Sequence, residues 1–85
     1  MESIYDNVNY IIYKRSHVNF ITSKNGSLCV CNKAIIKYKN MNNQNVYVAG
    51  FICTEYNTNK RFFTDPIMNC VDKPNESMLS WLNSN

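Results

Sequence analysis

The dipeptide Asn25-Gly26, which lies between two short runs of alternating apolar and polar residues, constrains the fold more than any other feature. Asparagine and glycine both accept the positive φ angles of a type I′ turn. An Asn-Gly pair between apolar runs is therefore a strong signal of a β-hairpin. The flanking runs are residues 18–22 and 28–31. The sequence predicts that these two runs are antiparallel strands joined by a tight turn.

Other β-type runs lie on either side of this hairpin. Residues 10–13 form a short apolar run that fits a strand or the end of a short helix. In residues 33–39 a strand would place three lysines on one face and the apolar side chains on the other. The lysines of that face are Lys33, Lys37 and Lys39.

The longest β-type run is residues 46–54, which is rich in Val, Tyr, Phe and Ile. Gly50 within this run indicates a bulge or a close approach of another part of the chain. A polar turn at residues 57–60 leads into a short last strand, residues 61–64, which ends at Asp65-Pro66.

The last part of the chain has the pattern of a short helix at residues 74–83. Asn75 is the predicted N-cap, and Met78, Trp81 and Leu82 fall on one side of the helix. This side either covers the open face of the chain's own sheet or docks on a partner. We therefore expect one domain, residues 1–85, with a mostly β (small α+β) fold. It should have a four- to five-stranded antiparallel sheet, with its core in residues 18–64, and a short C-terminal helix.

Basic residues are concentrated in the middle of the chain. Between residues 14 and 61 there are eight lysines and arginines against one acid, Glu55, and the other five acids lie in the two ends. This asymmetry is typical of a surface that binds a polyanion such as DNA, and a solvated lysine-rich sheet face is the alternative. The candidate nucleic-acid-binding residues are Lys14, Arg15, Lys24, Lys33, Lys37, Lys39, Lys60 and Arg61.

No pattern of catalytic residues is visible in the sequence. The only histidine is His17, and the only glycines are Gly26 and Gly50, so the chain lacks both a nucleophile elbow and a phosphate-binding loop. The acids are not paired in a way that suggests general acid–base chemistry. We therefore expect a protein that is not an enzyme.

Four cysteines raise the question of a metal site. Structural zinc sites usually take their ligands in close pairs, whereas only Cys29 and Cys31 are close in this sequence, and Cys53 and Cys70 are isolated. We expect no cofactor, and Cys29, Cys31 and Cys53 are the ligands if zinc is bound. The N-terminus carries acids before its apolar stretch, unlike a secretory signal. An intracellular chain is therefore expected, in which free thiols or a metal are favoured over disulfides.

The order of several residues resembles the FLYWCH-type zinc finger. Phe20, Ser23 and Gly26 match the start of that motif, Phe51 stands where the family has tryptophan, and Cys53 matches the first zinc ligand. The family is a compact antiparallel sheet related to the WRKY and GCM domains, found in insect chromatin proteins and in large DNA viruses of insects. The resemblance covers about residues 18–64 and implies a sheet that contacts DNA.

Most zinc ligands of the family are missing from this chain. No cysteine lies near Lys60 or Arg61, and no histidine follows Thr64. The resemblance therefore implies a degenerate finger that keeps the sheet without the metal.

Together these features predict a non-enzymatic small binding domain of viral origin, located in the host nucleus or cytoplasm. Its expected partner is DNA, or a host chromatin or regulatory protein, bound through the basic sheet face. One alternative is a small viral or phage inhibitor that blocks a host defence or regulatory protein without nucleic acid. Another is a structural subunit docked through the Trp81 helix. Neither a membrane nor a small-molecule substrate is expected, and a homo-oligomer is left open.

Overall fold

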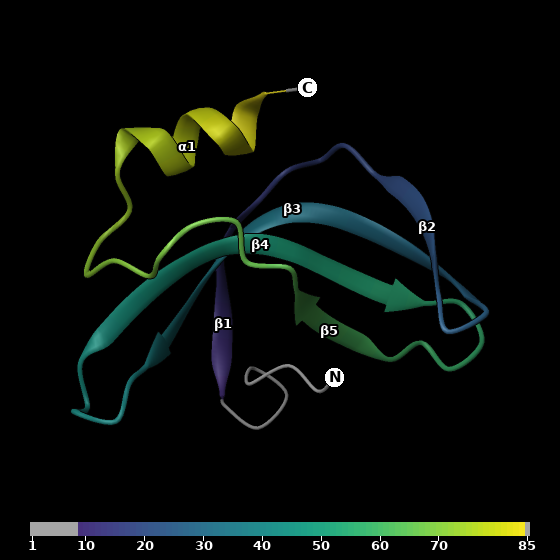
Figure 1. Cartoon of the computed structure of the whole chain (residues 1–85), viewed down its shortest axis with the longest axis horizontal. Coiled ribbons are helices and arrows are strands. Elements are labelled where there is room, and N and C mark those ends of the chain that lie inside the picture. Colours follow the sequence, from purple (N-terminus) through teal and green to yellow (C-terminus); the bar gives the residue numbers. More distant parts are fainter. Residues whose placement is uncertain (1–8, 85) are drawn as a thin grey trace.

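The computed structural model describes residues 9–84 and contains one antiparallel sheet and one helix (Figure 1). The elements are β1 (Tyr10–Arg15), β2 (Phe20–Lys24), β3 (Ser27–Lys39), β4 (Asn45–Glu55), β5 (Arg61–Thr64) and α1 (Glu76–Asn83). The predicted mostly β fold with a short C-terminal helix is confirmed. Within the described residues, no helix has the length and apolar character needed to cross a membrane.

The sheet has the strand order β1-β3-β4-β5, and β2 also pairs with β3. β1 and β2 lie end to end along one edge of β3, opposite residues 34–38 and 27–31 of that strand. β4 pairs with residues 29–39 of β3. β5 pairs with the other edge of β4, along residues 51–54. The two runs predicted on either side of residue 32 are therefore one long strand, because Asn32 continues the pairing opposite Ile52.

The hairpin predicted from Asn25-Gly26 is confirmed. Asn25 has φ 51° and Gly26 has φ 80°, which are the positive values that a type I′ turn requires. The flanking residues Lys24 and Ser27 are paired across the turn. The last strand, Arg61–Thr64, also lies where the sequence placed it.

Each face of the sheet carries its own apolar cluster. On one face, Ile35 and Ala49 are buried against Met78 and Leu82 of α1. We call this face the helix face. On the opposite face, the inner face, Phe63 is buried with the apolar side chains of β3 and β4. The exposed fractions of Met78 and Leu82 are 0% and 2%. Met78 and Leu82 therefore cover the chain's own sheet and are not free to dock on a partner.

Local signals in the sequence account for where α1 begins. The side-chain oxygen of Asn75 accepts a hydrogen bond from the backbone N–H of Met78 at 3.0 Å, as expected for an N-cap. Glu76 places a carboxylate in the first turn, where the helix dipole favours negative charge.

Gly50 marks a close approach and not a bulge. The register between β3 and β4 runs through the Ala34–Gly50 pair without a shift. A Cβ atom at Gly50 would lie 2.5 Å from Cζ of Phe63 and 2.9 Å from the carbonyl oxygen of Thr64. Phe63 therefore packs directly over the backbone of β4.

Candidate binding site

One row of side chains across the sheet creates a hollow on the helix face. Phe20 of β2 is paired with Cys31 of β3, Cys31 with Cys53 of β4, and Cys53 with Phe62 of β5. Directly paired residues project from the same face, so the four side chains form one line. The two small side chains lie in the middle and the two large ones at the ends. The result is a pocket of about 400 Å³.

A third phenylalanine closes the pocket on the side nearest α1. The ring of Phe51 makes edge-to-face contacts with Phe20 and with Trp81 of the helix, each with 5.6 Å between ring centroids. α1 itself packs over Ile35 and Ala49 and does not take part in the cysteine cluster, which is buried against Phe51 and Phe62. We call this hollow, walled by Phe20, Phe51 and Phe62, the phenylalanine pocket.

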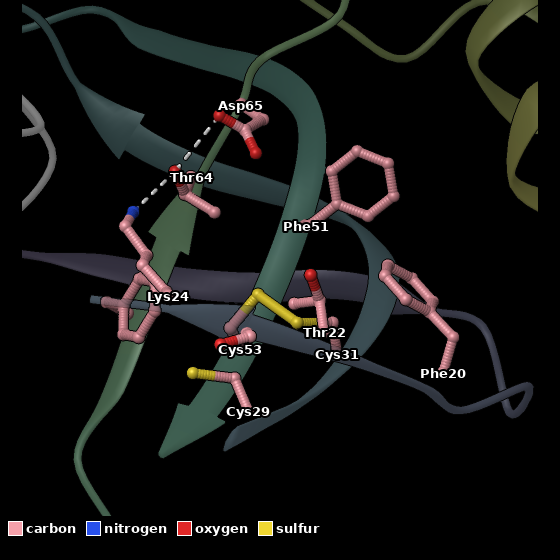
Figure 2. A pocket seen from close by; sticks show the side chains of 11 residues that line it. Phe20, Thr22, Lys24, Cys29, Cys31, Phe51, Cys53, Thr64 and Asp65 are labelled. Atoms are coloured by element: carbon pink, nitrogen blue, oxygen red, sulfur yellow. Dashed lines mark hydrogen bonds between the residues drawn. A yellow bond between two sulfur atoms is a disulfide. The ribbon is translucent and has the colours of Figure 1, made fainter. Parts of the chain in front are cut away.

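The mouth of the pocket carries charged and polar groups. Nζ of Lys24 on β2 donates to Oγ1 of Thr64 on β5 at 3.4 Å and lies 4.8 Å from the centroid of the Phe62 ring. The hydroxyl of Thr64 donates to Oδ1 of Asp65 at 3.3 Å (Figure 2). β3 and β4 lie between β2 and β5, so a contact between the outer strands shows that the sheet is concave here.

A disulfide between Cys31 and Cys53 forms the floor of the pocket. The carbonyl of Leu28 accepts a hydrogen bond from the N–H of Tyr56, the residue after β4, so Leu28 points its backbone groups to that side. Bonding alternates along an antiparallel ladder, so the N–H and carbonyl of Cys31 point away from β4 and its pair with Cys53 is not hydrogen-bonded. Side chains are closest in such pairs, and the two Cα atoms are 4.1 Å apart. The expectation of free thiols or metal ligands is therefore wrong for these two cysteines, because the register between β3 and β4 places them face to face.

The other two cysteines are free. Cys29 lies beside the disulfide on the same face (Figure 2) and is fully buried. Its thiol donates to the carbonyl of Ser27 at 3.9 Å. Cys70 is exposed and does not line this pocket. Within residues 9–84 there is no cluster of three or more His, Cys, Asp or Glu side chains able to hold a metal ion. The structure thus brings together the three cysteines named as conditional zinc ligands but binds two of them to each other.

We expect the purified protein to carry no stoichiometric zinc and its melting temperature to be unchanged by a chelator. Two of the three candidate thiols are consumed by the disulfide, so only Cys29 remains as a thiolate ligand. A structural zinc ion would contribute on the order of 10 kcal/mol to folding. Elemental analysis with a chelator titration checks this. One zinc per chain, with melting that drops on chelation, would contradict the prediction and assign the ion to Cys29, Cys31 and Cys53.

Lys33 has a structural role on the helix face. Its Nζ donates to the carbonyl oxygens of Trp81 and Ser84, each at 3.0 Å, and to the hydroxyl of Ser84 at 2.8 Å. Nζ also lies 5.2 Å from the centroid of the Trp81 ring. A cation at the C-terminal end of a helix satisfies carbonyls that have no partner within the helix. Lys33 therefore ties α1 to β3.

The other seven candidate nucleic-acid-binding residues are distributed over three parts of the molecule. Lys14 and Arg15 are exposed at the end of β1, near the last turn of α1. Lys37 is half-buried and Lys39 exposed at the C-terminal end of β3. The remaining three, Lys24, Lys60 and Arg61, are exposed towards the opposite end of the sheet. By the strand register, Lys14, Lys24, Lys33, Lys37 and Lys39 project from the helix face, as predicted for the three lysines of residues 33–39, while Arg61 projects from the inner face. They do not form one continuous patch, because Lys33 is bonded to α1 and Lys24 lies at the opposite end of the sheet from Lys37 and Lys39.

The main pocket residues that sequence reasoning missed are Phe62, Thr64 and Asp65. Phe20 and Phe51 were singled out only through the FLYWCH resemblance and not as walls of a pocket. Phe62 and Phe63 are consecutive residues of a strand, so their rings project from opposite faces of the sheet. No signal in the sequence pairs Phe62 with Cys53, because that pairing depends on the register between β4 and β5.

Comparison of the chain with protein-family models, with curated proteins and with solved structures gives no match.

Proposed function

We propose that this domain is a non-enzymatic protein-binding module whose phenylalanine pocket receives one large apolar side chain of a partner protein. The row Phe20–Cys31–Cys53–Phe62 carries this proposal. It makes an apolar hollow with a floor of buried cysteines, beside the part of the sheet that the helix covers. In protein interfaces, a few large side chains that fill such pockets provide most of the binding energy.

The groups at the pocket mouth favour an aromatic side chain with a polar tip. Ligand pockets in proteins are commonly about 300–1,000 Å³, and the volume here is at the lower end of that range. Lys24 brings an ammonium donor to the mouth, and Asp65 brings a carboxylate acceptor. A tyrosine hydroxyl or tryptophan N–H has a partner there, while the ring contacts the phenylalanine walls.

The chemistry around the pocket favours binding over catalysis. Cys29 is the only free thiol of the floor and is fully buried. The imidazole of His17 lines a different hollow, with Leu82 and Ser84, and so is not placed to activate that thiol.

Nucleic-acid binding has less support from this arrangement of charges. Phosphate contacts need several cations on one continuous surface, whereas the basic residues here lie in separate places and Lys33 is bonded to α1. DNA binding remains a prediction from the sequence, as do the FLYWCH resemblance, a viral origin and an intracellular location. A viral origin combined with the pocket favours the alternative of a small inhibitor that blocks a host protein by direct contact.

A displayed random-peptide library should yield peptides that share a tyrosine or tryptophan when selected against the protein. Phe20→Ala should weaken the binding of these peptides about tenfold or more, which is roughly 1.4 kcal/mol. Phe20 is 41% exposed, so the fold should survive its loss. Isothermal titration calorimetry of one selected peptide provides the measurement. The matched control is Ile21→Ala, which changes the neighbouring exposed residue on the opposite face and should alter affinity less than about twofold.

Peptides without a shared aromatic residue, or affinities that Phe20→Ala leaves unchanged, would contradict the proposal. The competing outcome is tight binding of duplex DNA with a steep dependence on salt. In that case, replacing Lys14, Lys37 and Lys39 by Gln should lower the salt slope by about three. Such a result, with no effect of Phe20→Ala, would assign the domain to nucleic acid.

A further inference from the structure

We propose that β2 pairs with β2 of a second copy of this chain, so that the protein forms a symmetric dimer through one continuous sheet. Among residues 9–84, β3 is the only strand that pairs with β2, and all five residues of β2 are exposed. Phe20 and Ile21 of this strand are 41% and 63% exposed. An uncovered edge strand with apolar side chains is a template for another strand.

The backbone groups of β2 that face outward are those of Ile21 and Ser23. The carbonyl of Leu28 accepts a bond from the N–H of Tyr56, so Leu28 points its backbone groups towards β4. Its partner across the ladder, Ser23, is therefore not bonded to β3, and the alternation of an antiparallel ladder gives the same result for Ile21. These two residues each present at the edge an N–H and a C=O that have no strand partner within the described part of the chain.

The sequence of β2 is complementary to itself in one antiparallel register. Ile21 and Ser23 must pair with each other or with themselves to exchange backbone hydrogen bonds. Only the register centred on Thr22 pairs all five strand residues. It places Thr22 opposite Thr22, Ile21 opposite Ser23 and Phe20 opposite Lys24.

The side chains that meet in this register fit one another. Lys24, the single charge of β2, lies opposite a ring, and it already makes such a contact with Phe62 in its own chain. A shift of the centre to Ser23 would place Lys24 opposite Thr22. A shift to Ile21 would leave Lys24 beside Val18, outside the strand. Pairing on Thr22 therefore gives the most contacts without opposing like charges.

The dimer would place two phenylalanine pockets on one surface. The two-fold axis of such a pairing is perpendicular to the sheet, so both helix faces point the same way. The pocket centres would lie about four strand spacings apart, roughly 20 Å. If the proposed function holds, a partner with two aromatic anchors gains affinity from binding both pockets. The dimer itself does not depend on that function.

Sedimentation equilibrium of the purified protein tests the dimer without any partner. A small interface of this kind associates weakly, so the dimer fraction should rise between about 10 µM and 1 mM. Ser23→Pro removes an outward N–H that takes no part in the pairing of β2 with β3 and should keep the protein monomeric over this range. Ser23→Ala keeps the N–H and should dimerise like the original protein. A monomer at the highest concentration, or a dimer that persists in Ser23→Pro, would overturn the proposal.

Cross-linking tests the register independently and decides the matter if Ser23→Pro does not fold. The background is Cys29→Ala with Cys70→Ser, which removes both free thiols. In this background Thr22→Cys should form a disulfide-linked dimer under mild oxidation, because the two thiols face each other in a close pair. Ile21→Cys and Ser23→Cys should each remain uncross-linked. Cross-linking at either of these, or none at Thr22→Cys, would rule out pairing centred on Thr22.

Discussion

A chain truncated after Pro74 should lose its cooperative unfolding transition. The deletion removes Met78 and Leu82, which are buried against Ile35 and Ala49. Burial of each such side chain stabilises the fold by roughly 1.5–3 kcal/mol, and the deletion also exposes the surface that they cover. A domain of this size has a total stability of only about 4–13 kcal/mol. Thermal melting followed by circular dichroism should show either a broad transition or no transition.

Two variants of the full-length chain test whether the buried contacts of α1, and not merely the presence of the helix, stabilise the fold. Leu82→Ala should lower the free energy of unfolding by about 2–5 kcal/mol, because it leaves a cavity under the helix. Ser80→Ala changes an exposed helix position and should leave stability unchanged or slightly higher. A truncated chain that melts like the full-length protein would show that α1 does not contribute to the core.

Gly50→Ala should lower the free energy of unfolding by about 3 kcal/mol or more, at or above the upper end of the usual range for overpacking. The new Cβ atom would lie 2.5 Å from Cζ of Phe63 and 2.9 Å from the carbonyl oxygen of Thr64. Phe63 is 1% exposed, so its ring has no empty space to move into. The carbonyl is part of the backbone of β5, so relieving the second contact requires β5 to move away from β4. Urea denaturation with a linear extrapolation gives the measurement.

Gly26→Ala is the matched control for Gly50→Ala. No atom lies within 4 Å of a Cβ at Gly26, and its φ of 80° alone should cost about 1–2 kcal/mol. A smaller side chain at residue 63 should rescue the clash. In the double variant Gly50→Ala/Phe63→Leu, the loss should therefore be smaller than the sum of the two single losses. Equal costs at Gly26 and Gly50, or strictly additive losses, would show that the contact with Phe63 is not the cause.

Those parts of the fold that depend on neighbours in the sequence were predictable. The Asn25-Gly26 turn, the strand at residues 61–64 and the N-cap at Asn75 all lie where the sequence indicates. The turn and the N-cap depend on interactions between residues only a few positions apart. The strand follows from a β-type run between a polar turn and Asp65-Pro66, so in each case the residue types are sufficient evidence. The prediction of separate strands at residues 28–31 and 33–39 was wrong. A polar residue such as Asn32 in the middle of a strand looks like a turn when its cross-strand partner is unknown.

The candidate site depends on contacts between residues that are distant in the sequence. Cys31 and Cys53 are separated by 22 positions, and only the register between β3 and β4 makes them partners. The registers of β2 with β3 and of β5 with β4 align Phe20 and Phe62 with them. The packing of α1 decides that Lys33 bonds to Trp81 and Ser84. A shift of one residue in either strand would move these side chains to the opposite face. The sequence by itself therefore determined the turns, the strand types and the helix start, which local hydrogen bonds and backbone angles control. Only the tertiary structure, through packing on both faces of the sheet, decided which cysteines are bonded and where the pocket lies.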